Sequence, residues 1–251
     1  MTAIIWREIK VSLGSLFGVV MQFSTPVFMM LLFATAFAGN IGKISMGGSN
    51  VNYLEFFAPG LFGYMTFYLF SVSFSFLRID SRTGMLSIIA LSKASINSYF
   101  WGKYYFQLAM AFLKIIMIVF ITVILTKSLP DLTPKNILIL MPTLLLSVAI
   151  WYGLGMLGGI YIHRDDLREV VVMLITLPLT FASSMYYSLD KMPGPIKMIA
   201  IFNPLTYTCN LFRGCYLNKL PEDYLFQLGI LLIVACFALS IALVSLKKVK
   251  F

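Results

Sequence analysis

The chain has 251 residues, of which 60% are hydrophobic and only 12% are charged. A soluble domain is typically about 45–50% apolar and about 25% charged, so this chain has too little polar surface to cover a water-exposed body of its size. Its formal net charge of +9 would suggest nucleic-acid binding in a soluble protein. In a membrane protein the same excess reflects Lys and Arg retained on the cytoplasmic side. The composition therefore excludes an ordinary soluble protein, indicates a lipid bilayer as the solvent and argues against a nucleic-acid partner.

The first segment, residues 1–16, is predicted to form an amphipathic helix. Apolar residues recur there at helical spacing, at Trp6, Ile9, Leu13 and Leu16. The other face carries Arg7, Glu8, Lys10 and Ser12. A helix with one apolar and one charged face is typical of the membrane interface, so we expect this segment to lie in the interface rather than to cross the bilayer.

Six further stretches are apolar and long enough to cross a bilayer, which takes about 20 residues of helix. They cover residues 17–38, 56–77, 104–126, 137–162, 170–187 and 224–244. The second is expected to begin near Pro59 and Gly60, because proline suits the first turn of a helix. Pro26 and Pro178 are places where the first and fifth spans could bend. The chain is thus predicted to be an all-α membrane protein with one transmembrane domain over residues 1–251.

Residues 188–223, between the fifth and sixth spans, contain apolar pieces too short to cross. Pro193 and Pro195 interrupt the first piece, and Asn203 followed by Pro204 is a helix-start signal, since asparagine favours the N-cap and proline the first helical position. The segment 205–217 should therefore be helical again. The simplest prediction is a re-entrant helical hairpin that dips in from the outer face.

The distribution of basic residues favours an orientation with both termini in the cytoplasm. In that orientation the cytoplasmic side collects Arg7, Lys10, Arg78, Arg82, Lys93, Lys103, Arg164, Arg168, Lys247, Lys248 and Lys250. The other side would carry fewer basic residues, spread over longer loops. The sequence therefore predicts a multi-pass protein of the cell (cytoplasmic or inner) membrane.

Lys114 is the ionisable residue that falls well inside a predicted span. A cation at that depth costs about 2.5–3.5 kcal/mol on insertion scales, so something must stabilise it. One interpretation places Lys114 beside a polar pathway or an acid, with Glu55 as the acid nearest to the outer half of a span. The other is that the span is tilted and the side chain of Lys114 snorkels to the interface. The sequence leaves both open.

The glycines Gly153, Gly155 and Gly158 match the spacing of a dinucleotide-binding turn, which needs a preceding strand and a helix N-terminus. They lie inside a long apolar span, however, and Gly155 and Gly159 are four residues apart. Small residues at that spacing are typical of helices that pack closely in a membrane, and we favour that interpretation.

Charged residues gather between the fourth and fifth spans, at His163, Arg164, Asp165, Asp166, Arg168 and Glu169. One histidine beside carboxylates could suggest a metal or acid–base site, but a zinc site usually needs three or four ligands and the chain has a single His. A solvated turn or a docking surface is the favoured interpretation. Cys209 and Cys215 would lie on different faces of one helix, so no disulfide is expected between them.

Catalytic and nucleotide-binding motifs are missing from the sequence. There is no G-x-x-x-x-G-K-[ST] segment to hold ATP, no membrane-embedded cluster of Asp residues to hold Mg²⁺, and no Ser and His pair within a span. No catalytic, cofactor-binding or metal-binding residue is therefore predicted on this chain.

Three segments together resemble the membrane subunits of type-2 ABC exporters, also called ABC-2 type permeases. Residues 53–61, Tyr-Leu-Glu-Phe-Phe-Ala-Pro-Gly-Leu, resemble the family's Y-x-x-F-x-x-P-G-[LI] pattern before the second span. Residues 78–86 fall where the family has a charged turn, although Thr83 and Gly84 are in reversed order and Ser87 replaces a usual Glu. The most specific likeness is in residues 202–214, where Asn203, Pro204, Tyr207 and Arg213 resemble N-P-[LM]-[TS]-[YH]-x-x-x-x-x-R.

The resemblance implies a half-transporter that pairs with a second membrane subunit, in the simplest case an identical one, and with two separate ATPase subunits that hold ATP and Mg²⁺. The basic loop 78–103 is then the predicted element that couples to the ATPase, together with the N-terminal helix and the turn 164–169. Its candidate coupling residues are Arg78, Asp80, Arg82, Thr83, Gly84, Leu86, Ile89 and Lys93. A short amphipathic helix in this loop would bury Leu86, Ile89 and Ile96 and expose Arg82, Lys93 and Lys103. An intramembrane enzyme and an assembly scaffold that works without an ATPase are the alternative functions.

Overall fold

The computed structural model describes the chain except for residues 15, 38–42, 47–48, 92–94, 190–191 and 249–251. The described part is helical apart from one short β-hairpin. The helices are α1 (Thr2–Leu13), α2 (Leu16–Phe37), α3 (Tyr53–Phe67), α4 (Leu69–Arg82), α5 (Met85–Leu91), α6 (Ile96–Thr126), α7 (Pro134–Tyr161), α8 (Asp165–Phe181), α9 (Gly194–Phe202), α10 (Pro204–Tyr216) and α11 (Tyr224–Lys248). The strands β1 (Lys43–Met46) and β2 (Ser49–Asn52) are antiparallel.

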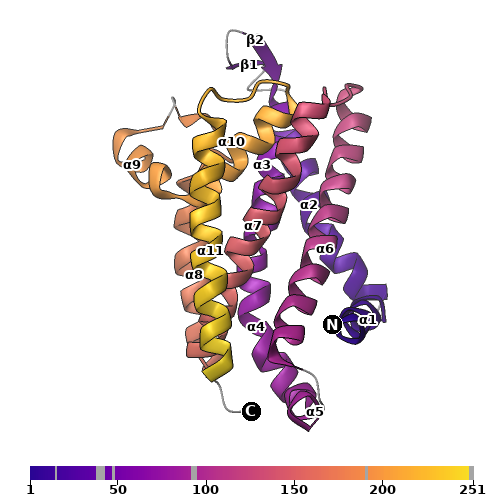
Figure 1. The fold of residues 1–251 in the computed structure, drawn as a ribbon. Helices are drawn as coiled ribbons and strands as arrows, with labels where there is room; N and C mark the ends of the chain where they lie inside the picture. Colours follow the sequence, from indigo (N-terminus) through magenta and orange to yellow (C-terminus); the bar gives the residue numbers. More distant parts are fainter. Residues whose placement is uncertain (15, 38–42, 47–48, 92–94, 190–191, 249–251) are drawn as a thin grey trace.

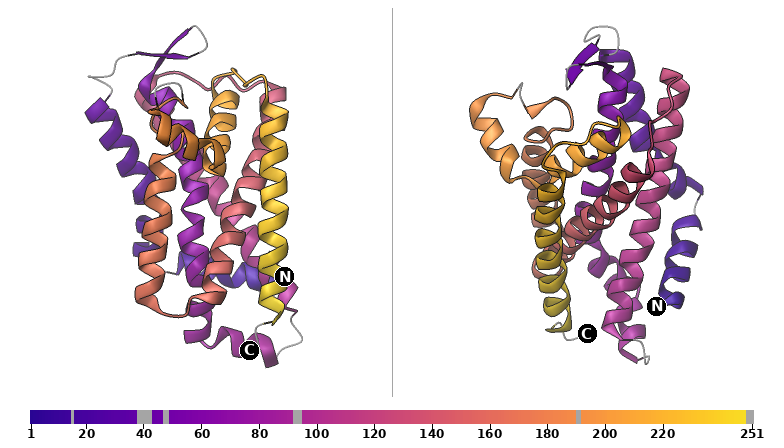
Figure 2. Two further views of the ribbon diagram at one scale, coloured as in Figure 1. Left: turned by 90° about the vertical axis from the view of Figure 1, so that its left-hand side faces the viewer. Right: turned by 45° about the horizontal axis from the view of Figure 1, so that its top comes forward.

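The long helices run side by side in one bundle (Figure 1). Helix α7 is at its centre and makes its most extensive contacts with α11 and α4. One end of the bundle, here called the terminal end, carries α1, α5 and the C-terminal end of α11 (Figures 1 and 2). The other, here called the hairpin end, carries β1, β2, α9 and α10. Charged and polar residues outside the bundle core are therefore divided between two distinct ends.

Aromatic side chains fill the core between α7 and the helices α3 and α4. The Trp151 ring meets Phe67 edge to face with 4.4 Å between ring centroids, a favoured aromatic geometry. Tyr152 donates to the Phe100 carbonyl at 2.7 Å and the Thr66 and Ser147 hydroxyls lie 2.6 Å apart, whereas the buried Ser73 hydroxyl and Trp151 ring N–H have no partner among the described residues. Pairing of this kind matters because an unsatisfied polar group in an apolar medium costs free energy.

The glycines of α7 confirm the helix-packing interpretation. A Cβ atom on Gly155 would collide with the backbone carbonyl of Phe70, and one on Gly159 would lie 2.6 Å from the Phe74 oxygen. On the other side of α7, a Cβ atom on Gly153 would lie 2.8 Å from the backbone of α11. The glycines therefore allow α4 and α11 to approach α7 at backbone distance, and they lie within one continuous helix rather than at a nucleotide-binding turn.

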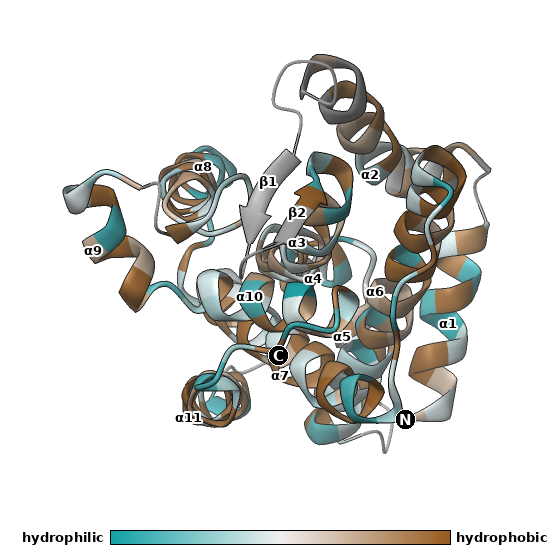
Figure 3. Ribbon diagram, turned by 90° about the horizontal axis from the view of Figure 1, so that it is seen from above, coloured by the Kyte–Doolittle hydropathy of each residue, from teal (hydrophilic) through white to brown (hydrophobic). Residues whose placement is uncertain are grey.

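Four of the helical segments in the described part are long and apolar enough to cross a bilayer: Tyr53–Arg82, which joins α3 and α4, Ile96–Thr126, Pro134–Tyr161 and Tyr224–Lys248. Seen along the bundle in Figure 3, the ribbons of α6 and α11 are largely hydrophobic. Many large apolar side chains on the long apolar segments are exposed, among them Phe120 of α6, Leu138 of α7 and Ile233 of α11. The protein is therefore a membrane protein, as its composition predicts.

The expected start of the second span is wrong. Helix α3 begins at Tyr53, where the Asn52 side chain accepts a hydrogen bond from the Leu54 N–H at 3.3 Å, as an N-cap residue does. Pro59 lies inside the helix. Gly60 serves packing instead, because a Cβ atom there would lie 2.6 Å from the Met185 carbonyl oxygen.

The prediction of a renewed helix after Asn203 is confirmed. Helix α10 starts at Pro204, and the Asn203 side chain accepts from the Leu205 N–H at 3.0 Å. Cys209 and Cys215 are buried and free, in agreement with the predicted lack of a disulfide between them. Helices α9 and α10 lie at the hairpin end (Figure 1), and α10 packs against α3, α7 and α11.

The close contact at Gly155 leads to a matched pair of substitutions. We expect Gly155→Ala to lower the free energy of unfolding by about 1–3 kcal/mol, the usual cost of overpacking, because the added methyl group meets backbone that cannot yield easily. Gly229→Ala on α11 is the control, since nothing lies within 4 Å of its added Cβ atom and alanine favours a helix. Thermal unfolding of the two purified variants gives the unfolding midpoint of each. Equal midpoints for the two would contradict the packing role of Gly155.

Candidate functional site

The loop predicted over residues 78–103 is shorter in the structure, because most of it is helical. Helix α4 extends to Arg82, so Arg78 and Asp80 lie on its last turns and Thr83 is its C-cap. Gly84 has a φ of +71°, a left-handed conformation that favours glycine, and it turns the chain into α5. Lys93 lies outside the described residues. The connection is thus a helix, a tight turn and a second short helix.

Helix α5 carries two of the predicted coupling residues. Ile89 is buried, and Leu86 packs against the core as a partly buried side chain. The opposite side is exposed at Ile88 and Leu91. Helix α5 therefore presents an apolar surface at the terminal end, where it lies in Figure 1.

A buried cluster of charged residues lies where α1, α4 and α6 meet, and is here called the charge cluster. Asp80 is at its centre: Oδ2 is 2.8 Å from Lys103 Nζ and Oδ1 is 3.1 Å from the Arg7 guanidinium. The Tyr99 hydroxyl donates to Oδ2 at 2.6 Å. Glu8 completes the cluster, 2.7 Å from Arg7 and 3.2 Å from Lys103. Two carboxylates therefore balance two cations in a compact group.

The position of Lys103 corrects the sequence prediction, which placed it on an exposed face. Its exposed fraction is 2%, and that of Asp80 is 1%. The ammonium group also lies 4.2 Å from the centroid of the Phe76 ring, a cation–π contact. The reason is that α6 begins at Ile96, so that Lys103 is a helical residue facing α4 and not part of a loop.

Helix α1 is oriented by this cluster. Its Ile4 and Glu8 side chains are buried, whereas the apolar Trp6 and Leu13 are exposed. Close packing on α6 contributes, since a Cβ atom on Gly102 would lie 3.0 Å from the Ile4 side chain. The polar face of α1 thus turns toward the protein and its apolar face away, which is the arrangement that a helix in the membrane interface requires.

A second, exposed group of ion pairs joins α4 to the start of α8. Asp165 lies 2.6 Å from the Arg78 guanidinium and 2.9 Å from that of Arg82. Arg78 also donates to the carbonyl of His163. No group of residues suited to hold a metal ion occurs in the part of the chain that the structure describes. The charged turn is therefore a surface in contact with α4.

Arg164 and Asp166 form a separate pair in the same turn, 2.6 Å apart. Hydrogen bonds from the Arg164 side chain hold the pKa of Asp166 below its ordinary value. Both side chains are mostly exposed, and exposed ion pairs contribute little to stability because water screens them. This pair is therefore a surface feature, unlike the charge cluster.

The motif residues of the hairpin end form a second buried site. Arg213, whose exposed fraction is 1%, donates through Nε to the Phe56 carbonyl at 3.1 Å and through Nη2 to the Ser184 carbonyl at 2.7 Å. Its guanidinium carbon lies 3.7 Å from the centroid of the Phe56 ring. Ser184 also donates to Asn210 at 2.7 Å. The arginine thus joins α10 to the start of α3 and to the segment after α8.

Asn203 makes the matching connection from the other end of α10. Its Nδ2 donates to the carbonyl groups of Leu179 and Ala182 at 2.7 and 2.8 Å. These groups belong to the last turn and the C-cap of α8, where carbonyls have no partner within the helix. Pro204 starts α10, and the Tyr207 hydroxyl donates to the Ile201 carbonyl of α9. The motif residues therefore hold the helix ends together and do not form a reaction centre.

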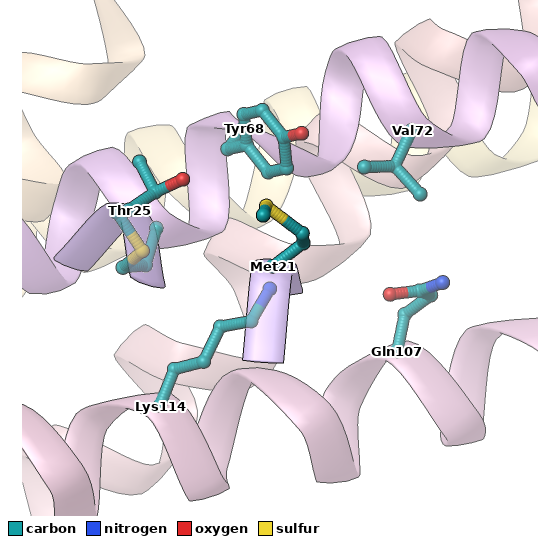
Figure 4. Close-up of a pocket in the computed structure, with 7 residues that line it drawn as sticks. Met21, Thr25, Tyr68, Val72, Gln107 and Lys114 are labelled. Atoms are coloured by element: carbon teal, nitrogen blue, oxygen red, sulfur yellow. The ribbon is translucent and has the colours of Figure 1, made fainter. Parts of the chain in front are cut away.

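Lys114 is buried between helices, with an exposed fraction of 3%. This burial rules out the interpretation that it snorkels to the interface. Among the described side chains no carboxylate, Glu55 included, lies within ion-pair distance of it. Lys114 instead points into a small pocket (Figure 4). Of the two sequence interpretations, this position fits the one that places Lys114 beside a polar pathway, and that role stays a prediction.

Sequence reasoning missed the charge cluster as a unit. It placed Asp80 among the coupling residues, but Glu8 and Lys103 on polar, solvated surfaces, and did not single out Tyr99. A usable signal existed, since Arg7 and Glu8 form the polar face of a helix whose apolar face needs the bilayer. Pairing that face with Asp80 and Lys103 requires the spatial arrangement of three helices, which no local pattern contains.

The chain is similar in sequence to known membrane permeases. The model of the family described as ABC-2 type transporter matches residues 1–217. Over 209 residues the chain is 27% identical to the putative transport permease ycf38 of Cyanophora paradoxa, an alignment that covers 81% of this chain and 70% of the relative. Over 241 residues it is 22% identical to the inner membrane transport permease YadH of Escherichia coli strain K12. That alignment covers 88% of this chain and 86% of the relative.

The charge cluster can be tested with two Asp→Asn substitutions. We expect Asp80→Asn to destabilise the fold by about 3–5 kcal/mol, the usual cost of removing one partner from a buried ion pair, because Lys103 keeps only Glu8 as a neutralising group. Asp166→Asn removes a carboxylate from an exposed pair and should leave the unfolding midpoint unchanged. Thermal unfolding of the purified chain distinguishes them, and an unchanged midpoint for Asp80→Asn would contradict a structural role for the cluster.

The arginine of the hairpin end calls for a conservative substitution. Arg213→Lys keeps the charge but cannot reach the Phe56 and Ser184 carbonyls with the same fork of donors. Each buried carbonyl left unpaired costs about 1–3 kcal/mol. Arg164→Lys, at an exposed position, is the matched control. We expect a lower unfolding midpoint only for Arg213→Lys, and a wild-type midpoint would show that the fork is not needed.

Proposed function

Because this chain belongs to the ABC-2 type transporter family, we propose that it is the membrane-spanning half of an ATP-driven exporter. Membership makes it a permease subunit of an ABC transporter, not an enzyme, and the relatives named above are transport permeases. The outward direction, the ATPase partner and the pairing of two membrane subunits are the parts proposed here.

The proposed topology has six crossings with both termini in the cytoplasm. Besides the four long apolar segments, α2 has 22 residues and α8 has 17, lengths of about 33 and 25 Å at 1.5 Å per residue. These lengths are close to the hydrocarbon thickness of about 30 Å. Helices α9 and α10 then form the re-entrant hairpin of the outer face. The terminal end, with its excess of basic residues, faces the cytoplasm.

Energy comes from a separate ABC ATPase, which holds ATP and Mg²⁺. The observation that carries this assignment is the charge cluster: it fixes the end of α4 to α1 and α6, directly before the turn into α5. A force applied to α5 is therefore transmitted to three helices together. The exposed Ile88 and Leu91 of α5 are the surface that we assign to ATPase contact.

Transport in this scheme uses two membrane subunits, in the simplest case two copies of this chain, with the pathway between them. ATP favours one arrangement of the two ATPases and thereby shifts the equilibrium between inward and outward states, because only a ligand with different affinities for two states can shift their populations. Pro26 and Pro178 lie inside α2 and α8 and are candidate places for bending.

The contact surface on α5 provides the test. Tagged chain is purified from membranes of its own source, and the eluate is assayed for an ABC ATPase and for ATP hydrolysis. We expect the Ile88→Asp variant to lose most of the co-purified ATPase and most of the ATP hydrolysis, because a charge on an apolar contact surface opposes docking. Ile199→Asp on α9, equally exposed but at the hairpin end, should retain both.

The unfolding midpoint of Ile88→Asp should match that of the wild type, since the side chain is exposed. Co-purification that survives Ile88→Asp would contradict the coupling surface. A wild-type chain that brings down no ATPase would contradict the exporter assignment and favour a scaffold. An activity that the isolated chain performs alone would favour an enzyme.

A further inference from the structure

The pocket at Lys114 lies between α2, α6 and the junction of α3 with α4. Its polar lining groups are Thr25, Tyr68, Gln107 and Lys114, and its apolar walls include Met21 and Met65. In Figure 4 the Lys114 and Gln107 side chains both rise from α6, Lys114 toward Met21 and Gln107 toward Val72. The cavity measures about 80 Å³, whereas one water needs about 10–15 Å³ by the same measure. It can therefore hold a polar group larger than a single water.

The charge in this pocket has no counter-ion from the described part of the chain. The Lys114 ammonium lies 5.7 Å from the centroid of the Tyr68 ring. This contrasts with Lys103, eleven residues earlier on the same helix, which has two carboxylates within 3.2 Å. A buried cation in a membrane normally pairs with an acid or faces a water-filled cavity, so the pocket is suited to an incoming anion.

Two residues that line the pocket are also exposed on the outside of the bundle. Met21 and Tyr68, on its rim, have exposed fractions of 52% and 41%. Along α2 the neighbouring Val20 and Phe28 are also exposed, so the approach to Lys114 is apolar. A free inorganic anion would have to cross this apolar surface, whereas an amphiphile could lay its chain along α2 and place its head group beside Lys114.

We propose that this pocket binds the anionic head group of an amphiphile that enters from the lipid side. Lys114 neutralises the phosphate or carboxylate, Gln107 and Tyr68 supply hydrogen-bond donors, and the hydrocarbon chain lies on the exposed face of α2. The inference deepens the proposed function and rests on it for one step only, namely that the bound amphiphile is the cargo of the permease.

Binding is tested on the purified, full-length chain in dodecyl maltoside by native mass spectrometry. The probe is dodecyl phosphate, compared with dodecylphosphocholine, which has the same chain length and no net charge. We expect the wild type to retain one dodecyl phosphate and Lys114→Met to bind it about tenfold more weakly, since a hydrogen bond to a charged group is worth at least that factor. Lys114→Arg keeps the charge and should bind.

Lys135→Met is the matched control, because Lys135 is exposed at the start of α7, and it should bind like the wild type. Removal of a buried cation should leave the unfolding midpoint of Lys114→Met equal to or above that of the wild type, so loss of binding cannot be attributed to unfolding. Equal binding by Lys114→Met, equal retention of dodecylphosphocholine, or full displacement of dodecyl phosphate by an equal concentration of inorganic phosphate would each overturn the proposal.

The cargo step has its own readout. In the complex with its ATPase, dodecyl phosphate should change ATP turnover of the wild type and not of Lys114→Met. Failure to bind the probe overturns the inference while ATPase association stays intact. Failure to associate with an ATPase overturns the proposed function while binding by the isolated chain persists.

Discussion

The contact between Asp80 and Lys103 is the interaction on which the arrangement of the terminal end depends. Each side chain alone would be a buried charge in a low-dielectric bundle, which is strongly unfavourable, and the pair is acceptable only because Arg7, Glu8 and Tyr99 complete its hydrogen bonds. The requirement for mutual satisfaction fixes the relative positions of α1, α4 and α6. Helix α1 consequently presents its apolar face outward.

Three buried cations in the described part of the chain are accommodated in three different ways. Lys103 is neutralised by carboxylates. Arg213 is held by backbone carbonyls and an aromatic ring, which suits a planar guanidinium with several donors. Lys114 has no carboxylate or carbonyl partner among the described residues, lies 5.7 Å from the centroid of the Tyr68 ring and faces a cavity. The first two arrangements join helix ends and give rigidity, whereas the third leaves a charge available for an external partner.

The two ends of the bundle are consequently built on different chemistry. The terminal end combines a charged interior with the exposed apolar side of α5, a combination that can receive force from a water-soluble partner and pass it to the helices. At the hairpin end, Asn203 and Arg213 close the carbonyl ends of α8 and the start of α3 without any ion pair among the described residues there. Such an end is suited to hold its shape while the other is moved.

Local information in the sequence determined the membrane environment, the helices and their caps. The apolar runs, the Asn203–Pro204 start of α10 and the close packing at Gly155 and Gly159 each depend on residues a few positions apart, so their physical causes are readable from the chain. Only the tertiary structure decided that Lys103 is buried and that Arg213 reaches Phe56. Those outcomes depend on partners from distant segments, because a buried charge or donor is stable only where another helix supplies its complement.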